Sequence, residues 1–252
     1  MSSDGPQTSH RFQDAQGGRD CLGNVLQLKG RWLAGALQTM TKCHLTICET
    51  KGKERRMRHM RYYWLRPQFA MPGKWVLGNI GHVDNWLFRH PPAEFMEPCT
   101  YTLDVLHDGA ERDYSVAGYA SVPVLSQRAY EALAGLPEVD EPYHHVVLEP
   151  VRIANKAVSQ DYFVMVIETQ VDCIDEQRSE FERFAVDDPV RPDLAGQYSY
   201  FFRLVIDPSK TGGRHIFRVK DYLGAIIVSE EVKRRFEAAG LVGLVFDSVD
   251  AD

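Results

Sequence analysis

The stretch IFRVKDYLGAIIVSEEVKRRFEAAGLVGLVFDSV, residues 216–249, carries the clearest structural pattern in this chain of 252 residues. Inside it, an apolar β-branched run at 225–228 leads through Ser229 into a charged segment. Gly240 then separates that segment from a second apolar run at 241–246. Short apolar runs on both sides of an amphipathic segment are typical of a strand, a helix and a second strand. The sequence therefore predicts a strand–helix–strand unit near the C-terminus.

Residues at both ends of the charged segment support the helix. Ser229 can accept a hydrogen bond from the free amide groups of the first turn, and Glu230 and Glu231 place negative charge at the positive end of the helix dipole. Three basic residues follow toward the other end, Lys233, Arg234 and Arg235. Val232 and Phe236, spaced by four residues, predict one buried face. The segment therefore has the residues that begin a helix and balance its dipole.

The residues around Gly240 predict how the helix ends. Glycine is the usual residue in the left-handed conformation just beyond a helix. If Ala239 is the last capping residue, Phe236 and Leu241 occupy the two positions whose side chains touch in a Schellman ending. The sequence therefore predicts a Schellman motif at Gly240.

A second segment, residues 122–137, repeats this order of residues as VPVLSQRAYEALAGLP. Ser126 occupies the capping position, Ala129 and Leu133 lie on one side of the expected helix, and Gly135 ends it. Two strand–Ser–helix–Gly–Leu units in one chain indicate either a weak internal repeat or one local solution used twice. Two copies are too few for a solenoid.

Together with other stretches, the C-terminal segment resembles a family of bacterial immunity proteins from polymorphic-toxin systems. That family is typified by a myxobacterial immunity domain and was formerly catalogued as a domain of unknown function. The matching stretches cover roughly residues 62–249, and residues 1–56 lie outside them. They are Tyr62-Tyr63, 73–78 (GKWVLG), 113–115 (DYS), 124–126 (VLS), 171–175 (VDCID) with Ser179, 216–218 (IFR), 227–229 (IVS) and 239–246 (AGLVGLVF).

The resemblance implies that the protein binds and neutralises a cognate secreted toxin. Such a toxin would be delivered by contact-dependent or type VI secretion from a neighbouring or sister cell and would act in the cytoplasm. The resemblance implies an inhibitor that works by binding and not by catalysis.

Composition and cysteine usage are those of an ordinary cytoplasmic protein. Apolar residues make up 44% and charged residues 25% of the chain. No run approaches the roughly 20 apolar residues that span a bilayer, and the N-terminus lacks the apolar core of a secretion signal. Five scattered cysteines favour reduced thiols over a disulfide framework. Cys43, His44 and Cys48 lack the close spacing of zinc ligands, so we expect no metal and no cofactor.

Residues 1–56 differ from the rest of the chain. They contain nine basic and five acidic residues and one weakly patterned helix candidate, residues 25–40. Such a segment buries too little apolar surface to offset the entropy of ordering it. We therefore expect it to be disordered, or to be upstream sequence with Met57 or Met60 as the natural start. The remaining chain is expected to form a β-rich half, 57–140, and an α+β half, 141–252.

Charge indicates what kind of partner the folded part prefers. The whole chain has a net charge of −6, whereas residues 57–252, with 20 basic and 30 acidic residues, carry −10. An acidic body repels nucleic acid and anionic membranes, and it attracts a basic protein. We therefore expect a basic toxin, such as a nuclease, as the partner. The oligomeric state is left open.

Alternating and β-branched runs predict the strands of an α+β fold. We expect a mixed or antiparallel sheet on which the two Ser-capped helices pack. The strand candidates are residues 61–65, 74–77, 101–106, 143–151, 162–171, 198–206 and 216–219. Trp75 is expected in the core, because large aromatic side chains dominate core area. Arg218, between Phe217 and Val219, is expected to reach an acid across the sheet.

The connection 168–193 is the most acidic part of the chain. It holds nine acidic residues and three arginines, a balance of −6 in 26 residues. One interpretation is a docking surface that speeds encounter with a cationic protein. The alternative is a solvated loop, in which Asp172 and Asp175 accept backbone hydrogen bonds or pair with an arginine. The docking candidates are Asp172, Asp175, Glu176, Glu180, Glu182, Asp187 and Asp188.

Enzymatic readings have weaker support in the sequence. No nucleophile elbow, zincin helix, phosphate loop or kinase signature is present. Asp172 and Asp175 as a catalytic or metal pair lack a recognisable partner. His144 and His145 are adjacent, so a strand would send them to opposite faces. The rival hypotheses are a cytosolic hydrolase or modifying enzyme that combines the acidic connection with His145 or His215, and a binding module unrelated to toxins.

Overall fold

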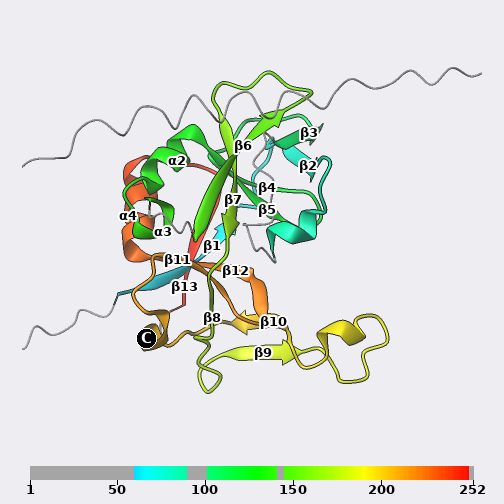
Figure 1. Cartoon of the computed structure of the whole chain (residues 1–252), viewed down its shortest axis with the longest axis vertical. Helices are drawn as coiled ribbons and strands as arrows, with labels where there is room; N and C mark the ends of the chain where they lie inside the picture. The colour runs from blue at the N-terminus through cyan, green and yellow to red at the C-terminus, as the bar shows by residue number, and fades with distance from the viewer. Residues whose placement is uncertain (1–59, 90–100, 141–144, 250–252) are drawn as a thin grey trace, which may run out of the picture. The chain divides into compact units, whose positions relative to one another are not determined.

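The computed structural model describes residues 60–89, 101–140 and 145–249. Within them the chain forms a closed barrel, a five-stranded sheet and a two-stranded ribbon (Figure 1). None of the helices described there has the length and apolar character needed to cross a membrane. The expectations for residues 1–56, for Cys43, His44 and Cys48, and for His144 fall outside the described residues.

The barrel runs in the order β2-β3-β6-β7-β5-β4. The pairs β3–β6 and β2–β4 are parallel, and the other pairs are antiparallel. Side chains such as Leu77, Leu103 and Val164 form its core. Its strands are β2 (Val76–Ile80), β3 (Tyr101–His107), β4 (Tyr114–Ala117), β5 (Val122–Ser126), β6 (Val146–Ile153) and β7 (Tyr162–Ile167).

The five-stranded sheet has the order β13-β1-β12-β11-β8 and is built on the C-terminal segment. Its central strand β12 pairs with β1 and β11, and β8 adds to β11 in parallel. Ile226 and Val228 belong to the core cluster that also contains α2 and α4 residues, whereas Ala225 and Ile227 belong to a second cluster. The strands are β1 (Tyr62–Pro67), β8 (Gln170–Val171), β11 (Ile216–Val219), β12 (Tyr222–Ser229) and β13 (Leu244–Ser248).

Both predicted Ser-capped helices are confirmed. Ser126 begins α2 (Gln127–Leu133) and accepts from the amide of Ala129, and Ser229 begins α4 (Glu230–Ala238) and accepts from the amide of Val232. A one-turn helix α3 (Pro137–Asp140) follows α2. Gly135 and Gly240 have φ angles of 79° and 62°, the left-handed region that favours glycine.

The predicted Schellman ending at Gly240 is also confirmed. The amide of Gly240 donates to the carbonyl of Glu237 at 3.0 Å, and the amide of Leu241 donates to the carbonyl of Phe236 at 3.1 Å. These two bonds satisfy carbonyls that the end of a helix leaves free. Leu241 packs against the core cluster that contains Phe236.

The two similar units pack together and cap each other. Arg128 of α2 donates to the carbonyl of Ala239 beyond α4, and Arg235 of α4 donates at 2.7 Å to the carbonyl of Ala134 beyond α2. Each arginine thus places its charge at the negative end of the neighbouring helix. The two strand–Ser–helix–Gly–Leu units therefore stabilise each other, because each supplies the arginine that caps the helix of the other.

Asp113 joins the two units from a buried position. It is 2% exposed and accepts from the Ser126 hydroxyl at 2.8 Å, from the Val242 amide at 2.9 Å and from Arg128 at 3.2 Å. A buried carboxylate is stable only when such donors surround it. This residue therefore ties the start of α2 to the segment that follows α4.

The predicted α+β class agrees with the structure in general, but the barrel and several strands were not predicted. The run 162–171 is split into β7 and β8, and β4 lies within a stretch to which no strand was assigned. Barrel strands come from both sides of residue 140, so a division there does not separate the two sheets. Pairing between distant strands closes the barrel, and local periodicity carries no information on such pairing.

Candidate protein-binding face

The acidic connection forms part of a ribbon of two antiparallel strands, β9 (Glu180–Arg183) and β10 (Tyr198–Arg203). One side of this ribbon packs inward. Phe181, Tyr198 and Phe201 lie in contact there. Tyr198 and Phe201 belong to a core cluster of the five-stranded sheet, and Phe181 packs against it. The Arg183 guanidinium lies 4.1 Å from the centre of the Tyr198 ring. The inner side therefore fixes the position of the ribbon.

The outer side of the ribbon presents aromatic side chains to solvent. Tyr200 is 53% exposed and Phe202 is 65% exposed, and their rings contact each other edge to face at 5.0 Å. Glu182 lies directly opposite Tyr200 in the strand pairing, and Glu180 lies opposite Arg203. We call Glu180, Glu182, Tyr200 and Phe202 the outer ribbon face. A contiguous exposed apolar patch can mark a site of protein–protein contact.

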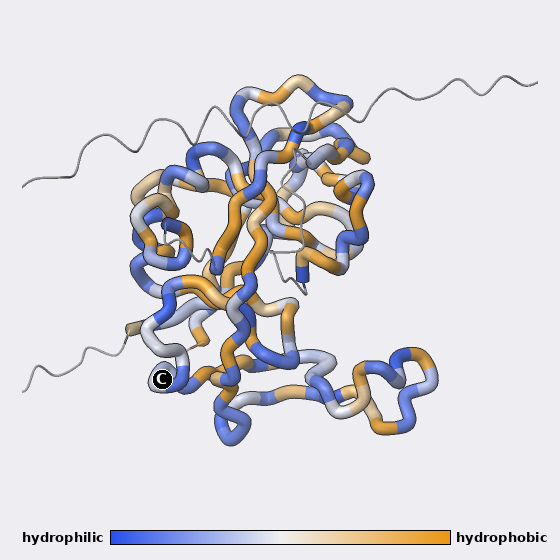
Figure 2. The backbone as a smooth tube through the Cα atoms, viewed as in Figure 1, coloured by the Kyte–Doolittle hydropathy of each residue, from blue (hydrophilic) through white to orange (hydrophobic). Residues whose placement is uncertain are grey.

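Three of the predicted docking acids are engaged within the chain. Asp175 accepts from the amides of Gln177 and Arg178 and pairs with the Arg178 side chain at 3.4 Å. Glu176 pairs with Arg183 at 2.6 Å and accepts from the Tyr198 hydroxyl. Figure 2 shows the loop that carries Asp175 and Glu176, between β8 and β9, as hydrophilic. These contacts confirm that Asp175 shapes the connection.

Asp188 is the third engaged acid, and it also shapes the chain. Its carboxylate accepts from the amides of Val190 and Arg191, both at 2.8 Å. The amide of Arg191, followed by that of Val190, holds the pKa of Asp188 below its ordinary value. The Tyr198 hydroxyl is shifted the other way, because burial, and then its bond to Glu176, raises its pKa to about 12.

The other four predicted acids are free. Asp172, Glu180, Glu182 and Asp187 are exposed, and within residues 60–89, 101–140 and 145–249 none of their carboxylates has a hydrogen bond or an ion pair. Glu180 and Glu182 lie on the outer ribbon face beside the exposed rings. The structure therefore divides the acidic connection into residues that hold its shape and residues whose charge is unpaired.

Arg218 differs from its prediction. Its side chain is 2% exposed, but it reaches no acid in the described part of the chain. It donates to the carbonyl of Leu223 in the adjoining hairpin. The strand positions opposite Arg218 are Ile226 on β12 and Gln170 on β8, and neither carries a carboxylate. The expected cross-strand ion pair is therefore wrong.

Trp75 is a core residue, as predicted. It is 2% exposed and donates from its indole nitrogen to the Ser115 hydroxyl at 2.8 Å.

Cys173 is buried, and burial, with the charge of Asp172 next, raises the pKa of its thiol to about 12. A thiol with that pKa stays protonated at neutral pH and is a poor nucleophile.

The two histidines of the hydrolase hypothesis do not join the acidic connection in a common site. The His215 ring lies 2.8 Å from the Ser229 hydroxyl, which caps α4 and is fully buried. His145 is exposed, and its carbonyl accepts from the amide of Glu168 at the start of the connection. No cluster of three or more metal-ligating side chains is found among the described residues.

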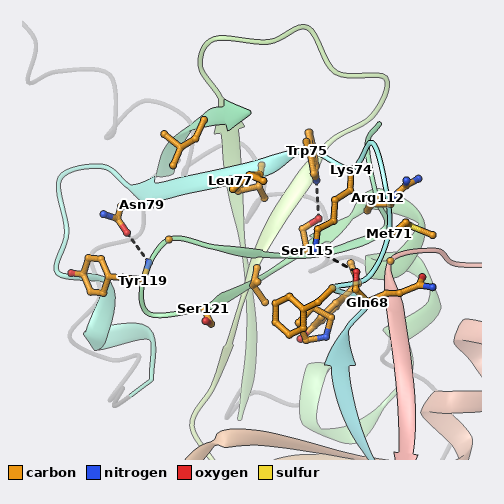
Figure 3. A pocket seen from close by; sticks show the side chains of 18 residues that line it. Gln68, Met71, Lys74, Trp75, Leu77, Asn79, Arg112, Ser115, Tyr119 and Ser121 are labelled. Carbon is orange, nitrogen blue, oxygen red and sulfur yellow. Dashed lines mark hydrogen bonds between the residues drawn. The ribbon is translucent and has the colours of Figure 1, made fainter. Parts of the chain in front are cut away.

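A groove with a volume of about 540 Å³ is lined by residues of β2 and β4 and by the segment that follows β1. Figure 3 shows its lining, with the Trp75–Ser115 hydrogen bond across it and Lys74 and Arg112 near one end. Phe69 and Tyr119 are exposed on its rim. The groove is mostly apolar and brings together none of the acidic residues predicted to bind a partner.

Sequence reasoning missed Tyr200, Phe202 and Asp113. The run YSYFFRLVI was predicted as one strand with no side assigned to its rings, whereas in the structure Tyr200 and Phe202 are exposed and Phe201 is buried. Alternation alone would group Tyr198 with the exposed rings, but Tyr198 is buried because the strand pairing shifts register between Tyr198 and Tyr200. Asp113 lies in the matched stretch DYS, but its bonds to Ser126 and Val242 could not be predicted, because both residues are distant from it in sequence.

Two comparisons with known proteins bear on function. Residues 38–251 match the model of the Immunity protein family (Imm11). The match covers most of the chain and begins before the stretches on which the resemblance was based. No curated protein is detectably similar to the chain.

Proposed function

The chain belongs to the Imm11 family of immunity proteins, and from this premise we propose that it binds a cognate bacterial toxin through its outer ribbon face. Binding takes place in the cytoplasm, where it blocks the toxin stoichiometrically. The observation that carries the proposal is the combination on one face of two exposed aromatic rings, Tyr200 and Phe202, with two unpaired carboxylates, Glu180 and Glu182.

This combination suits a tight protein interface. Binding energy usually concentrates in a few aromatic or arginine side chains that a polar rim shields from water. Tyr200 and Phe202 supply the anchors, and the ring contact between them holds both in place before binding. The inner side of the ribbon is packed on the core cluster, so little order has to be gained on association.

The unpaired charges favour a basic partner. Glu180 and Glu182, with Asp172 and Asp187 nearby in sequence, attract a cationic surface and raise its rate of encounter. A nuclease or another enzyme that acts on nucleic acid carries such a surface. The proposed toxin is therefore a basic protein of this class.

The proposal predicts that a neighbouring gene encodes a toxin-like protein, and co-expression of that protein with this chain tests it. Cells that produce the toxin should die without this chain and survive with it, and the two proteins should co-purify in a one-to-one complex. Survival that does not depend on this chain, or protection without a complex, would contradict binding as the mechanism. An exposed-residue control, Leu106→Ala on the barrel, should protect as well as the unaltered chain does.

A further inference from the structure

A cavity of about 890 Å³ lies on the inner side of the ribbon, away from the outer ribbon face. Its walls come from the 3₁₀ turn η1 (Asn85–Phe88), from the start of β12 and from the segment that joins β9 to β10. Trp86, Arg89 and Tyr222 line it. Gly224 also lines it, and a Cβ added there would meet no atom within 4 Å. The cavity is thus open space bordered by aromatic rings and a cation.

Arg218 lies directly behind this wall. One terminal nitrogen donates to the carbonyl of Leu223, and Leu223 lines the cavity beside Gly224. The Nε and the other terminal nitrogen are buried and have no hydrogen-bond partner among the residues that the structure describes. A guanidinium is charged at neutral pH, and the charge normally requires a carboxylate or several carbonyls when it is buried.

The charges around Arg218 leave it uncompensated. Burial, and next the positive charge of Arg89, lowers its pKa to about 10, which still leaves it protonated at neutral pH. No carboxylate in the described residues forms an ion pair with either arginine. The two cations therefore have no carboxylate partner among the described residues, and the Arg218 side chain is buried away from water. In a low-dielectric region, such a pair attracts an anion far more strongly than it would in water.

Arg89 is placed to contact such an anion. Its Nε donates to the carbonyl of Ala120 at 2.5 Å, and its guanidinium lies 5.3 Å from the centre of the Trp86 ring. Within the described part of the chain its two terminal nitrogens make no bond, and Arg89 lines the cavity. Two parallel N–H groups of a guanidinium match the geometry of a phosphate or a carboxylate.

We propose that the cavity binds an oxyanion, the phosphate or carboxylate group of a small molecule, on Arg89 with the charge of Arg218 behind it. The rings of Trp86 and Tyr222 border the space for the rest of the ligand. Two acids also line the cavity, and one of them, Asp193, is paired with Arg191 at 2.8 Å. The other acid is Asp221, in the β11–β12 turn. Of the two arginines that line the cavity, Arg191 is paired with Asp193, and Arg89 has no ion pair in the described residues, so the anion is assigned to Arg89.

Calorimetric titration with inorganic phosphate, and separately with acetate, tests this site at constant ionic strength set by chloride. We expect at least one probe to bind with one anion per chain. Arg89→Met and Arg218→Met should each weaken that binding about tenfold or more, because each removes a charged partner. Arg218→Lys, which keeps the charge, should weaken it less. Arg152→Met removes an exposed arginine of β6 that makes no bond in the described residues and should change nothing.

The titration separates the two sources of the anion and can overturn the site. Binding of phosphate alone assigns a phosphorylated ligand, and binding of acetate alone assigns a carboxylate. If neither probe binds, or if Arg89→Met binds as well as the unaltered chain, the site does not exist. Because Arg89 lies in the cavity wall and not in a core cluster, its variant remains informative even if Arg218→Met fails to fold. The result does not depend on the toxin.

Discussion

The α2–α4 helix pair and the β9–β10 ribbon differ in whether their charged side chains have partners inside the chain. In the helix pair, Asp113 has donors on both of its oxygens, and Arg128 and Arg235 each cap the neighbouring helix. In the ribbon, Glu180 and Glu182 have no partner in the described residues, and two aromatic rings face solvent. Charges satisfied inside the chain specify its fold, whereas charges left free next to exposed rings are available to a partner.

Removing Asp113 should have the largest effect. Asp113→Ala leaves Arg128, the Ser126 hydroxyl and the Val242 amide without their acceptor, and we expect a loss of about 3 kcal/mol or more in the free energy of unfolding. Urea denaturation followed by circular dichroism measures it. Asp172→Ala, at an exposed and unpaired acid, should change stability by less than about 0.5 kcal/mol. If both variants were equally stable, the claim that Asp113 stabilises the fold and Asp172 does not would be wrong.

Truncating the exposed rings should weaken toxin binding and leave folding intact. Tyr200→Ala and Phe202→Ala together should cost about 2 kcal/mol or more of binding free energy, roughly a thirtyfold weaker Kd, because buried aromatic anchors dominate interfaces. Surface plasmon resonance should show the change mostly in the dissociation rate. Leu106→Ala, another exposed apolar residue, is the matched control. An unchanged Kd would place the interface elsewhere.

Gly240→Ala tests the helix pair at its backbone. The φ angle of 62° disfavours any residue with a Cβ, while the added atom would meet only Arg128, at 3.9 Å. We therefore expect a loss of about 1–2 kcal/mol in stability from conformation alone. Gly224→Ala, at a glycine without a positive φ and with open space around it, should cost less. Thermal unfolding of both variants checks this: a larger loss for Gly240→Ala indicates backbone strain, and equal losses indicate that any glycine-to-alanine change is destabilising.

Neutralising free acids should slow association without changing stability. Glu180→Gln with Glu182→Gln should lower the association rate severalfold at low salt, and the difference should shrink at high salt as the charges are screened. Glu176→Gln removes an acid already paired with Arg183 and should slow association less. A salt-independent effect, or an equal effect of the paired acid, would show that free charge on the ribbon does not guide the toxin.

The smallest effect concerns acid stability of the helix pair. Bonds from Arg234, and then Arg235, lower the pKa of Glu231 to about 2 from an ordinary value near 4.5. Its contribution is therefore present above pH 4.5 and is lost as pH falls toward 2. Glu231 and its two arginine partners are partly exposed, so Glu231→Gln should lower the free energy of unfolding by less than about 1 kcal/mol at pH 7. The difference in that free energy from the unaltered chain should shrink by pH 3. A constant difference across this range would assign the effect to packing.

The sequence predicted one of the two regions far better than the other. Ser126, Ser229, Gly135 and Gly240 act within a few residues of their own positions, so local patterns were enough to place both helices and the Schellman ending. The role of Asp113 depends on Val242, which is far away in sequence, and the reciprocal capping by Arg128 and Arg235 depends on how the helices pack. Local patterns do not contain such contacts.

For the candidate site, the sequence located the acidic connection but not the part of it that is available. Composition counts charges, whereas the structure shows that Asp175, Glu176 and Asp188 are used within the chain. The exposed rings of Tyr200 and Phe202 lie in a run predicted only as a strand, and the register shifts that decide which of its rings are exposed leave no local sequence signal. For Arg218 the prediction was wrong in the other direction, because an arginine in an apolar strand predicts a nearby acid, and none pairs with it among the described residues.

The most direct test of the central claim is survival of toxin-producing cells that express the variant Glu180→Gln, Glu182→Gln, Tyr200→Ala and Phe202→Ala. Circular dichroism and urea unfolding should first establish that this variant is as stable as the unaltered chain, since all four side chains are exposed. We predict that the folded variant fails to protect and that the unaltered chain protects fully. Full protection by the folded variant would contradict the assignment of the outer ribbon face as the toxin-binding surface.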